Sequence, residues 1–215
     1  MALFPNPERC ARNIQAFQRK YPRDVAQLSE LWQALSAQQT PDVFENVQPA
    51  FIKLLGRWQG YRNQLTKNAG ILTELAENNA VLAALTDLIC LVQRTSSLSE
   101  ILERKESIRV LFDFLKYNLL QRHVPARIVT VSKSMLMLSG FSVGFDSKVL
   151  QQIKRASPYA LAVSGVWPFC LYFDMLEYIA SEQQAWETQY ARSMQALLPN
   201  VQIGQVMDRI LWRDP

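Results

Sequence analysis

Residues 98–119, LSEILERKESIRVLFDFLKYNL, carry the pattern that decides the fold class. Apolar side chains recur there every three or four positions, so they share one face of an α-helix. They are Leu98, Ile101, Leu102, Ile108, Leu111, Phe112, Leu115 and Leu119. Charged and polar residues fill the other positions. The stretch therefore predicts an amphipathic helical region that ends near Arg122.

Apolar residues at helical spacing also occur before and after residues 98–119, and residues typical of helix starts separate these stretches. Asn6-Pro7 and Thr40-Pro41 each place a capping side chain before a proline, where the missing proline N–H is harmless. Asn78-Asn79 predicts a break in the apolar stretch 71–92. Further along, we expect helices over 126–138 and 147–156, a long helix after Pro168, and a last helix over 201–212.

Composition agrees with an all-α chain. The 215 residues include only 7 glycines and 10 prolines, too few for the turns of a sandwich, a barrel or repeated βα units. With 49% hydrophobic residues the chain can bury a substantial core. We predict one helical domain over residues 1–215, with about eight to ten helices and a soft boundary at 95–97.

The few histidines and cysteines in the chain limit the kinds of catalytic and metal sites that it can form. His123 is the one histidine, and Cys10, Cys90 and Cys170 are widely separated. Histidine-rich metal sites, paired-cysteine sites and Cys-His-Asp triads therefore have little to be built from, and we expect no metal or cofactor. The N-terminus has no signal-peptide pattern, and the apolar run 159–173 is too short to cross a bilayer. These features predict a cytoplasmic protein that does not enter a membrane.

Positive charge is concentrated in one part of the sequence. Residues 114–173 contain seven basic side chains and one acidic side chain, whereas residues 174–215 contain three basic and six acidic ones. Such a block can attract nucleic-acid phosphates, or its residues can simply be solvated on several faces. The candidate phosphate-binding residues are Arg122, Arg127, Lys148, Lys154 and Arg155.

The segment 131–149 carries the most distinctive motif. Ser132-Lys133-Ser134-Met135 lies on an expected helix, and Phe145-Asp146-Ser147-Lys148-Val149 follows at the next expected helix start. This arrangement resembles a group of largely uncharacterised, all-helical bacterial proteins with a Ser-Lys-x-Leu segment, an aromatic loop and an aromatic-Asp-Ser-x-Val segment. That group often ends in a helix with an Asp four residues before a Trp, as Asp208 and Trp212 are here.

A more distant similarity links this segment to helix-hairpin-helix DNA glycosylases. Those enzymes place an Asp at a loop-to-helix junction, then a hydroxyl residue, an aliphatic residue and an Arg, at the spacing of Asp146, Ser147, Val149 and Arg155. The resemblance implies that Asp146 stabilises positive charge on the sugar as a base leaves, and that Lys133 forms a Schiff base. Residues 123–128 contain no glycine, so the glycine-rich hairpin of that family is not expected.

Each of these residues also has a structural interpretation. Asp146 can cap the helix 147–156 and pair with Lys133 without any chemistry. Asp208 and Trp212 are one helical turn apart and can dock the last helix on a neighbour. Two functions therefore stay open: a non-catalytic binding protein, for nucleic acid or another protein, that uses the basic segment 116–155, and a DNA-processing enzyme that uses Lys133 and Asp146.

Overall fold

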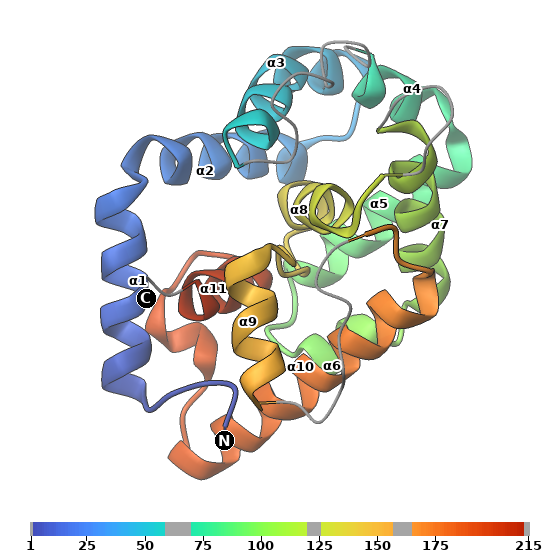
Figure 1. Cartoon of the computed structure of the whole chain (residues 1–215). Helices are drawn as coiled ribbons and strands as arrows, with labels where there is room; N and C mark the ends of the chain where they lie inside the picture. Colours follow the sequence, from blue (N-terminus) through green and yellow to red (C-terminus); the bar gives the residue numbers. More distant parts are fainter. Residues whose placement is uncertain (1, 59–69, 120–125, 157–164, 213–215) are drawn as a thin grey trace.

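A computed structural model describes residues 2–58, 70–119, 126–156 and 165–212 of the chain (Figure 1). The first three helices begin at prolines, as the sequence predicts for the first and third of them. In α1 (Pro7–Lys20), Oδ1 of Asn6 accepts a 3.0 Å hydrogen bond from the N–H of Arg9. Two further prolines open α2 (Pro22–Ala37) and α3 (Pro41–Arg57).

The apolar middle of the chain forms four helices. Asn78 separates α4 (Ile71–Glu77) from α5 (Asn79–Val92), and its side chain accepts a hydrogen bond from the N–H of Val81. The amphipathic stripe of residues 98–119 is divided between α6 (Leu98–Leu102) and α7 (Lys105–Asn118). At the division, Arg104 lies 3.4 Å from Asp87 of α5, a tertiary contact that no local pattern reveals.

The remaining elements are α8 (Ile128–Ser139), α9 (Ser147–Ala156), α10 (Phe169–Tyr190), the 3-10 helix η2 (Met194–Leu197) and α11 (Ile203–Leu211). The described residues thus hold eleven α-helices, ten of them at least seven residues long, slightly more than predicted. The all-α class is confirmed. In the described part of the chain no single helix is long and apolar enough to cross a membrane; α4 and α5 pass that test only as a pair, bent by 97°.

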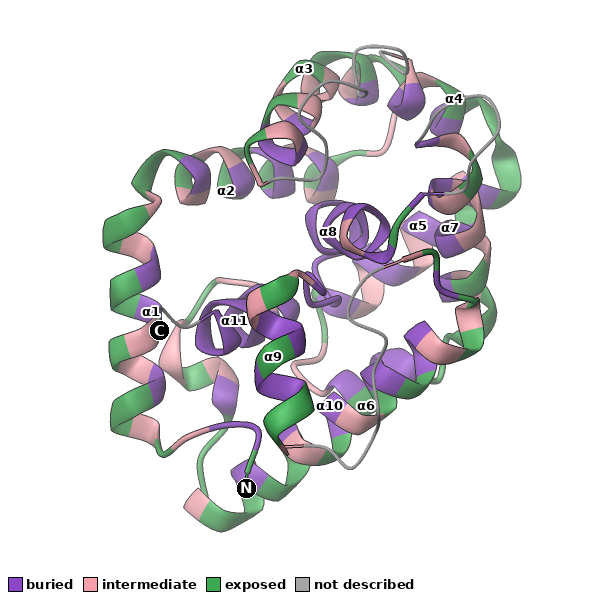
Figure 2. Ribbon diagram, viewed as in Figure 1, coloured by how far each residue is buried: buried purple, intermediate pink, exposed green. Residues whose placement is uncertain are grey.

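Helix α8 lies in the centre of the molecule (Figure 1). It contacts α2 and α3 on one side and α5 and α7 on another. Nearly all of its residues are buried, as are those of α11 (Figure 2). One hydrophobic cluster contains residues from both sides of the segment 95–97. A lysine or an aspartate on α8 or α11 is therefore surrounded by protein, which sets it apart from ordinary surface charge.

The loop between α8 and α9 is held against the start of α11. Gly140 ends α8 with a positive φ of 74°, a conformation that favours glycine. Its carbonyl accepts a 3.0 Å hydrogen bond from the N–H of Gly204. A Cβ atom on Gly204 would lie 2.4 Å from the backbone of Phe141 and Ser142. This backbone contact fixes where the following turns of α11 point.

Candidate functional site

Lys133 and Asp146 meet across the junction of α8 and α9. Nζ of Lys133 lies 3.1 Å from Oδ2 of Asp146, and the two side chains are 10% and 20% exposed. The lysine is in the middle of α8, whereas the aspartate precedes the first residue of α9. The two residues that the sequence motif singles out therefore form one ion pair, which is partly accessible to solvent.

Asp146 is held by the start of α9. Its Oδ1 atom accepts hydrogen bonds from the N–H groups of Lys148, at 2.9 Å, and Val149, at 3.1 Å. This is the capping geometry that satisfies otherwise unpaired N–H groups and favours a negative charge at a helix N-terminus. Nearby, the hydroxyl of Ser132 accepts a 2.8 Å hydrogen bond from the N–H of Phe145 and so ties the loop to α8. One carboxylate oxygen caps the helix while the other faces the lysine.

Lys133 has a second partner at the end of α3. Its Nζ atom donates a 2.9 Å hydrogen bond to the carbonyl oxygen of Trp58 and lies 5.7 Å from the centre of that indole ring. Together with the contact to Asp146, this occupies two of the three donors of an ammonium group. The third donor has no partner among the described residues.

Asp208 brings a second carboxyl group into the site from α11. Its Oδ1 atom accepts a 2.8 Å hydrogen bond from the N–H of Gly144, in the loop before Asp146. Burial, and secondly the negative charge of Asp146, raise the pKa of Asp208 to about 7, while Lys133 and the Gly144 N–H act in the opposite direction. The site therefore holds two carboxyl groups of different character, one paired with a lysine and one that binds a proton near neutral pH.

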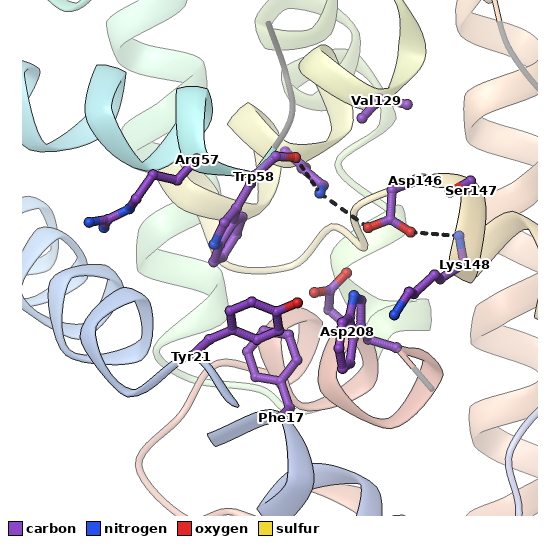
Figure 3. Close-up of a pocket in the computed structure, with 11 residues that line it drawn as sticks. Phe17, Tyr21, Arg57, Trp58, Val129, Asp146, Ser147, Lys148 and Asp208 are labelled. Atoms are coloured by element: carbon purple, nitrogen blue, oxygen red, sulfur yellow. Dashed lines mark hydrogen bonds and ion pairs between the residues drawn. The ribbon is translucent and has the colours of Figure 1, made fainter. Parts of the chain in front are cut away.

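These groups line a pocket of about 320 Å³ (Figure 3). Its lining residues come from α1, the end of α3, α8, the start of α9 and α11. They are Phe17, Tyr21, Arg57, Trp58, Val129, Lys133, Asp146, Ser147, Lys148, Asp208 and Trp212. Arg57 and Ser147 are exposed, so the pocket reaches the surface. It combines aromatic walls with a small number of charged groups, a composition typical of sites for small polar molecules.

The aromatic wall is built from contacts between helices distant in the sequence. Trp212 packs edge-on against Phe17 of α1 and against Tyr21, which follows α1, with ring centres 5.4 Å and 5.0 Å apart. Nζ of Lys148 lies 3.8 Å from the centre of the Trp212 ring. On the other side, Nε1 of Trp58 donates a 2.9 Å hydrogen bond to Asp24, which also pairs with Arg57 at 2.8 Å. The indole rings are thus fixed before any ligand enters.

The structure brings together most of the sequence-predicted site residues. Lys133, Asp146, Ser147, Lys148, Asp208 and Trp212 line the pocket. Ser132 is buried behind it, with its hydroxyl bonded to backbone groups.

The residues predicted to bind phosphate are less concentrated. Lys154 and Arg155 are exposed at the other end of α9, roughly 10 Å along the helix from Lys148.

Two further predictions on the basic segment concern residues near α8. Arg127 is exposed directly before the first residue of that helix and does not line the pocket. Arg122, together with His123, lies outside the described residues.

Five pocket residues were missed by sequence reasoning: Phe17, Tyr21, Arg57, Trp58 and Val129. Phe17, Tyr21 and Trp58 fit the apolar faces of their helices, a pattern that predicts core residues, and Phe17 is buried. The sequence signal that could have identified two of these pocket residues was their position at the end of a helix. Tyr21 and Trp58 follow the last residues of α1 and α3, where an aromatic ring can have one face in the core and one in a pocket.

In the part of the chain that the structure describes, no three His, Cys, Asp or Glu side chains form a cluster that could hold a metal ion. Comparison with known proteins found no family model, no curated protein and no solved structure that matches this chain.

Proposed function

We propose that this protein is a DNA-processing enzyme that excises a base in the manner of a glycosylase, with Lys133 and Asp146 at its reactive centre. One observation carries the proposal: the Lys133–Asp146 pair, at 3.1 Å, lies in a pocket that reaches the surface instead of in a closed core. A nucleophilic lysine needs an adjacent base that accepts its ammonium proton, and Asp146 is placed to do so. The glycosylase-like spacing around Asp146 points to the same chemistry.

The pocket dimensions suit one extruded base. A volume of about 320 Å³ is at the lower end of small-molecule sites and matches a single flat heterocycle better than a larger ligand. Trp58 contributes a flat apolar surface on which a base can stack, and the carboxyl groups offer partners for its polar edge.

Lys133 would act as the nucleophile. Its ammonium proton passes to Asp146 across their 3.1 Å contact, which leaves a neutral amine. The amine attacks C1′ of the deoxyribose, the C1′–N bond breaks, and the base leaves with the electron pair. The sugar ring then opens, its oxygen takes a proton from Nζ, and an iminium between Nζ and C1′ remains.

Asp208 would supply the proton that the departing base needs. Its raised pKa keeps a fraction of the carboxyl protonated near neutral pH, whereas Asp146 accepts hydrogen bonds from two backbone N–H groups and faces a lysine. A carboxyl group that donates a proton beside one that accepts a proton is the usual arrangement of a general acid and a general base. Proton transfer from Asp208 to the base nitrogen balances the charge of the leaving group.

The hydrogen bonds that Lys133 and Asp146 make with the backbone favour a second function, nucleic-acid binding without catalysis. Lys133 bonds to the carbonyl of Trp58, and Asp146 caps α9, so both side chains already have structural partners. A protein that binds nucleic acid without chemistry would use the pocket to hold a base and the basic residues Lys148, Lys154 and Arg155 to hold phosphates.

Borohydride trapping tests the enzymatic proposal. The full-length protein is incubated with DNA duplexes that each carry one oxidised, deaminated or alkylated base, in the presence of sodium borohydride. Reduction of the iminium by hydride leaves a stable Nζ–C1′ bond, seen as a covalent protein–DNA band on a denaturing gel. We expect such a band with at least one duplex and none with an undamaged duplex.

Variants locate the reacting amine. Lys133→Ala must abolish the band, and Asp146→Asn must weaken it, whereas Lys53→Ala, an exposed lysine on α3 outside the pocket, must leave it intact. If no duplex gives a band, or if Lys133→Ala still does, the enzymatic proposal fails. Salt-dependent retention of DNA without any product would then support the non-catalytic binding function.

A further inference from the structure

Arg209 follows Asp208 on α11 but lines a different cavity. Its side chain is only 3% exposed. Nη2 donates a 3.2 Å hydrogen bond to the amide oxygen of Gln205, while Nη1 is buried and has no hydrogen-bond partner. One face of the guanidinium is 5.9 Å from the centre of the Phe17 ring. The group is therefore enclosed by protein but only partly satisfied.

The positive charge of Arg209 is offset only in part, because burial lowers its pKa by more than the charge of the neighbouring Asp208 raises it. No ion pair joins it to a carboxylate among the described residues, and its neighbour Asp208 bonds to Gly144 in the other pocket. An arginine stays protonated in proteins, so the cost of burying this charge is not relieved by loss of a proton. A buried charge with one neutral hydrogen-bond partner is an unfavourable arrangement. An anion beside it would remove the imbalance.

The cavity that Arg209 lines has room and donors for such an anion. It measures about 290 Å³ and lies between α1, α2 and residues 200–209. Its floor includes the buried Gln205 and Arg209, and its mouth includes the exposed Ser29 and Gln33. Amide and hydroxyl groups of Gln18, Ser36 and Gln202 also line it, and none of its described lining residues is a carboxylate. Ser36 and Gln205 already donate hydrogen bonds to Gln33 and Gln202, and no side chain of negative charge among the described lining residues would repel an anion.

We propose that this cavity is a binding site for a small oxyanion of the phosphate class, with Arg209 as the charged anchor and the surrounding amide and hydroxyl groups as additional donors. A guanidinium is suited to this role because its planar set of N–H groups matches two oxygens of a tetrahedral anion. The ligand is either a free phosphate ion or a phosphate group within a nucleic acid. The site is separate from the pocket of Lys133 and does not depend on the function proposed for that pocket.

Thermal unfolding of the full chain with inorganic phosphate tests the site, with sodium chloride at equal ionic strength as reference. We expect a saturable rise in Tm of roughly 3 to 6 °C when phosphate reaches about ten times its dissociation constant. Arg209→Gln removes the anchor and must abolish the rise. Because a buried substitution can disturb folding, Ser29→Glu at the exposed mouth provides an independent test, since its carboxylate repels an anion from the cavity.

Matched variants complete the design. Ser181→Glu adds the same charge at an exposed position of α10 and must keep the phosphate response, as must Lys133→Ala in the other pocket. The proposal is overturned if phosphate raises Tm no more than chloride does, or if the rise persists in both Arg209→Gln and Ser29→Glu.

A parallel titration with a hexathymidine oligonucleotide distinguishes a free phosphate ion from a phosphate group of a nucleic acid. Weaker oligonucleotide binding in Ser29→Glu than in Ser181→Glu identifies a nucleic-acid phosphate, and equal binding identifies a free anion.

Discussion

The N–H group of Gly144 donates a 2.8 Å hydrogen bond to Oδ1 of Asp208, across 64 residues of sequence. This bond joins the loop that delivers Asp146 to the helix that delivers Asp208. It fixes two carboxyl groups in one pocket, and it does so through the backbone N–H of a glycine. The different behaviour of the two carboxyl groups leads to the first prediction.

Stability should depend on the titration of Asp208. Its pKa rises from 3.8 to about 7 on folding, so between these values the folded state holds a proton that the unfolded state has lost. Stability from this group is therefore full below pH 4 and decreases as pH rises to 7, by up to about 4 kcal/mol. Asp208→Asn keeps the acceptor for Gly144 but cannot ionise. We expect the variant to match the wild type at pH 4 and to be more stable at pH 8.

Urea unfolding at the two pH values measures this difference. Asp174→Asn, at an exposed position of α10, is the control and should give the same small change at both pH values. An equal gap between Asp208→Asn and the wild type at pH 4 and pH 8 would show that Asp208 does not titrate in this way.

Asp146 should contribute to stability in two separable ways. Asp146→Asn retains an oxygen that can cap α9 but loses the charge that faces Lys133, and should cost about 1 kcal/mol. Asp146→Ala loses both and should cost roughly 2 kcal/mol, because cap removal adds about 1 kcal/mol. Chemical denaturation of both variants measures the two terms. Equal losses in the two variants would mean that the cap contributes nothing.

Two glycines should respond in opposite directions to alanine. At Gly204 a new Cβ would lie 2.4 Å from the backbone of the loop after α8, which cannot move without shifting Asp146 or α11. We expect a loss of about 3 kcal/mol, at the upper end of the cost of overpacking. Gly56 is helical and nothing lies within 4 Å of its added Cβ, so Gly56→Ala should stabilise α3 by about 0.5 to 1 kcal/mol.

Calorimetry of the two alanine variants gives the comparison directly. A change of 1 kcal/mol corresponds to about 2 to 4 °C in Tm for a chain of this size. If Gly204→Ala melts at the same temperature as the wild type, α11 is not seated against the loop as described.

Nucleic-acid binding, under either proposed function, should follow the basic residues of α9. Removing Lys148 should weaken binding and lower the slope of log K against log salt by about 1, as expected for the loss of one phosphate contact. The double variant Lys154→Ala with Arg155→Ala should lower it by about 2. Fluorescence anisotropy with a labelled duplex at several salt concentrations measures the slope. Lys105→Ala on α7 is the control, and an equal effect of that variant would indicate only general attraction to positive charge.

The elements that the sequence predicts well are those governed by local interactions. Asn6, Asn78 and Asp146 each cap a helix that begins within three residues of them, so a short window contains all the atoms involved. The division of residues 98–119 into two helices is different. It occurs beside the contact between Arg104 and Asp87 of α5, and the apolar spacing on either side does not reveal it.

The candidate site was predictable in part for the same reason. Lys133 and Asp146 belong to one motif, and the spacing of Asp208 and Trp212 places them on one face of one helix. Tyr21 and Trp58 could not be distinguished from core residues, because an aromatic residue at helical spacing has the same pattern in a core and in a pocket wall. Only the packing of α1 and α3 around α8 and α11 shows which surface their rings face.

The backbone contact between Gly204 and the loop after α8 has a consequence for protein synthesis. Residues 17–148, which supply most of the pocket, leave the ribosome well before α11 does. Until then the loop has no partner at Gly204, the pocket lacks Asp208 and Trp212, and the apolar residues that later pack on α11 are uncovered. During this stage of synthesis the nascent chain exposes apolar surface and its pocket is incomplete. This is therefore the stage at which protection from aggregation matters most.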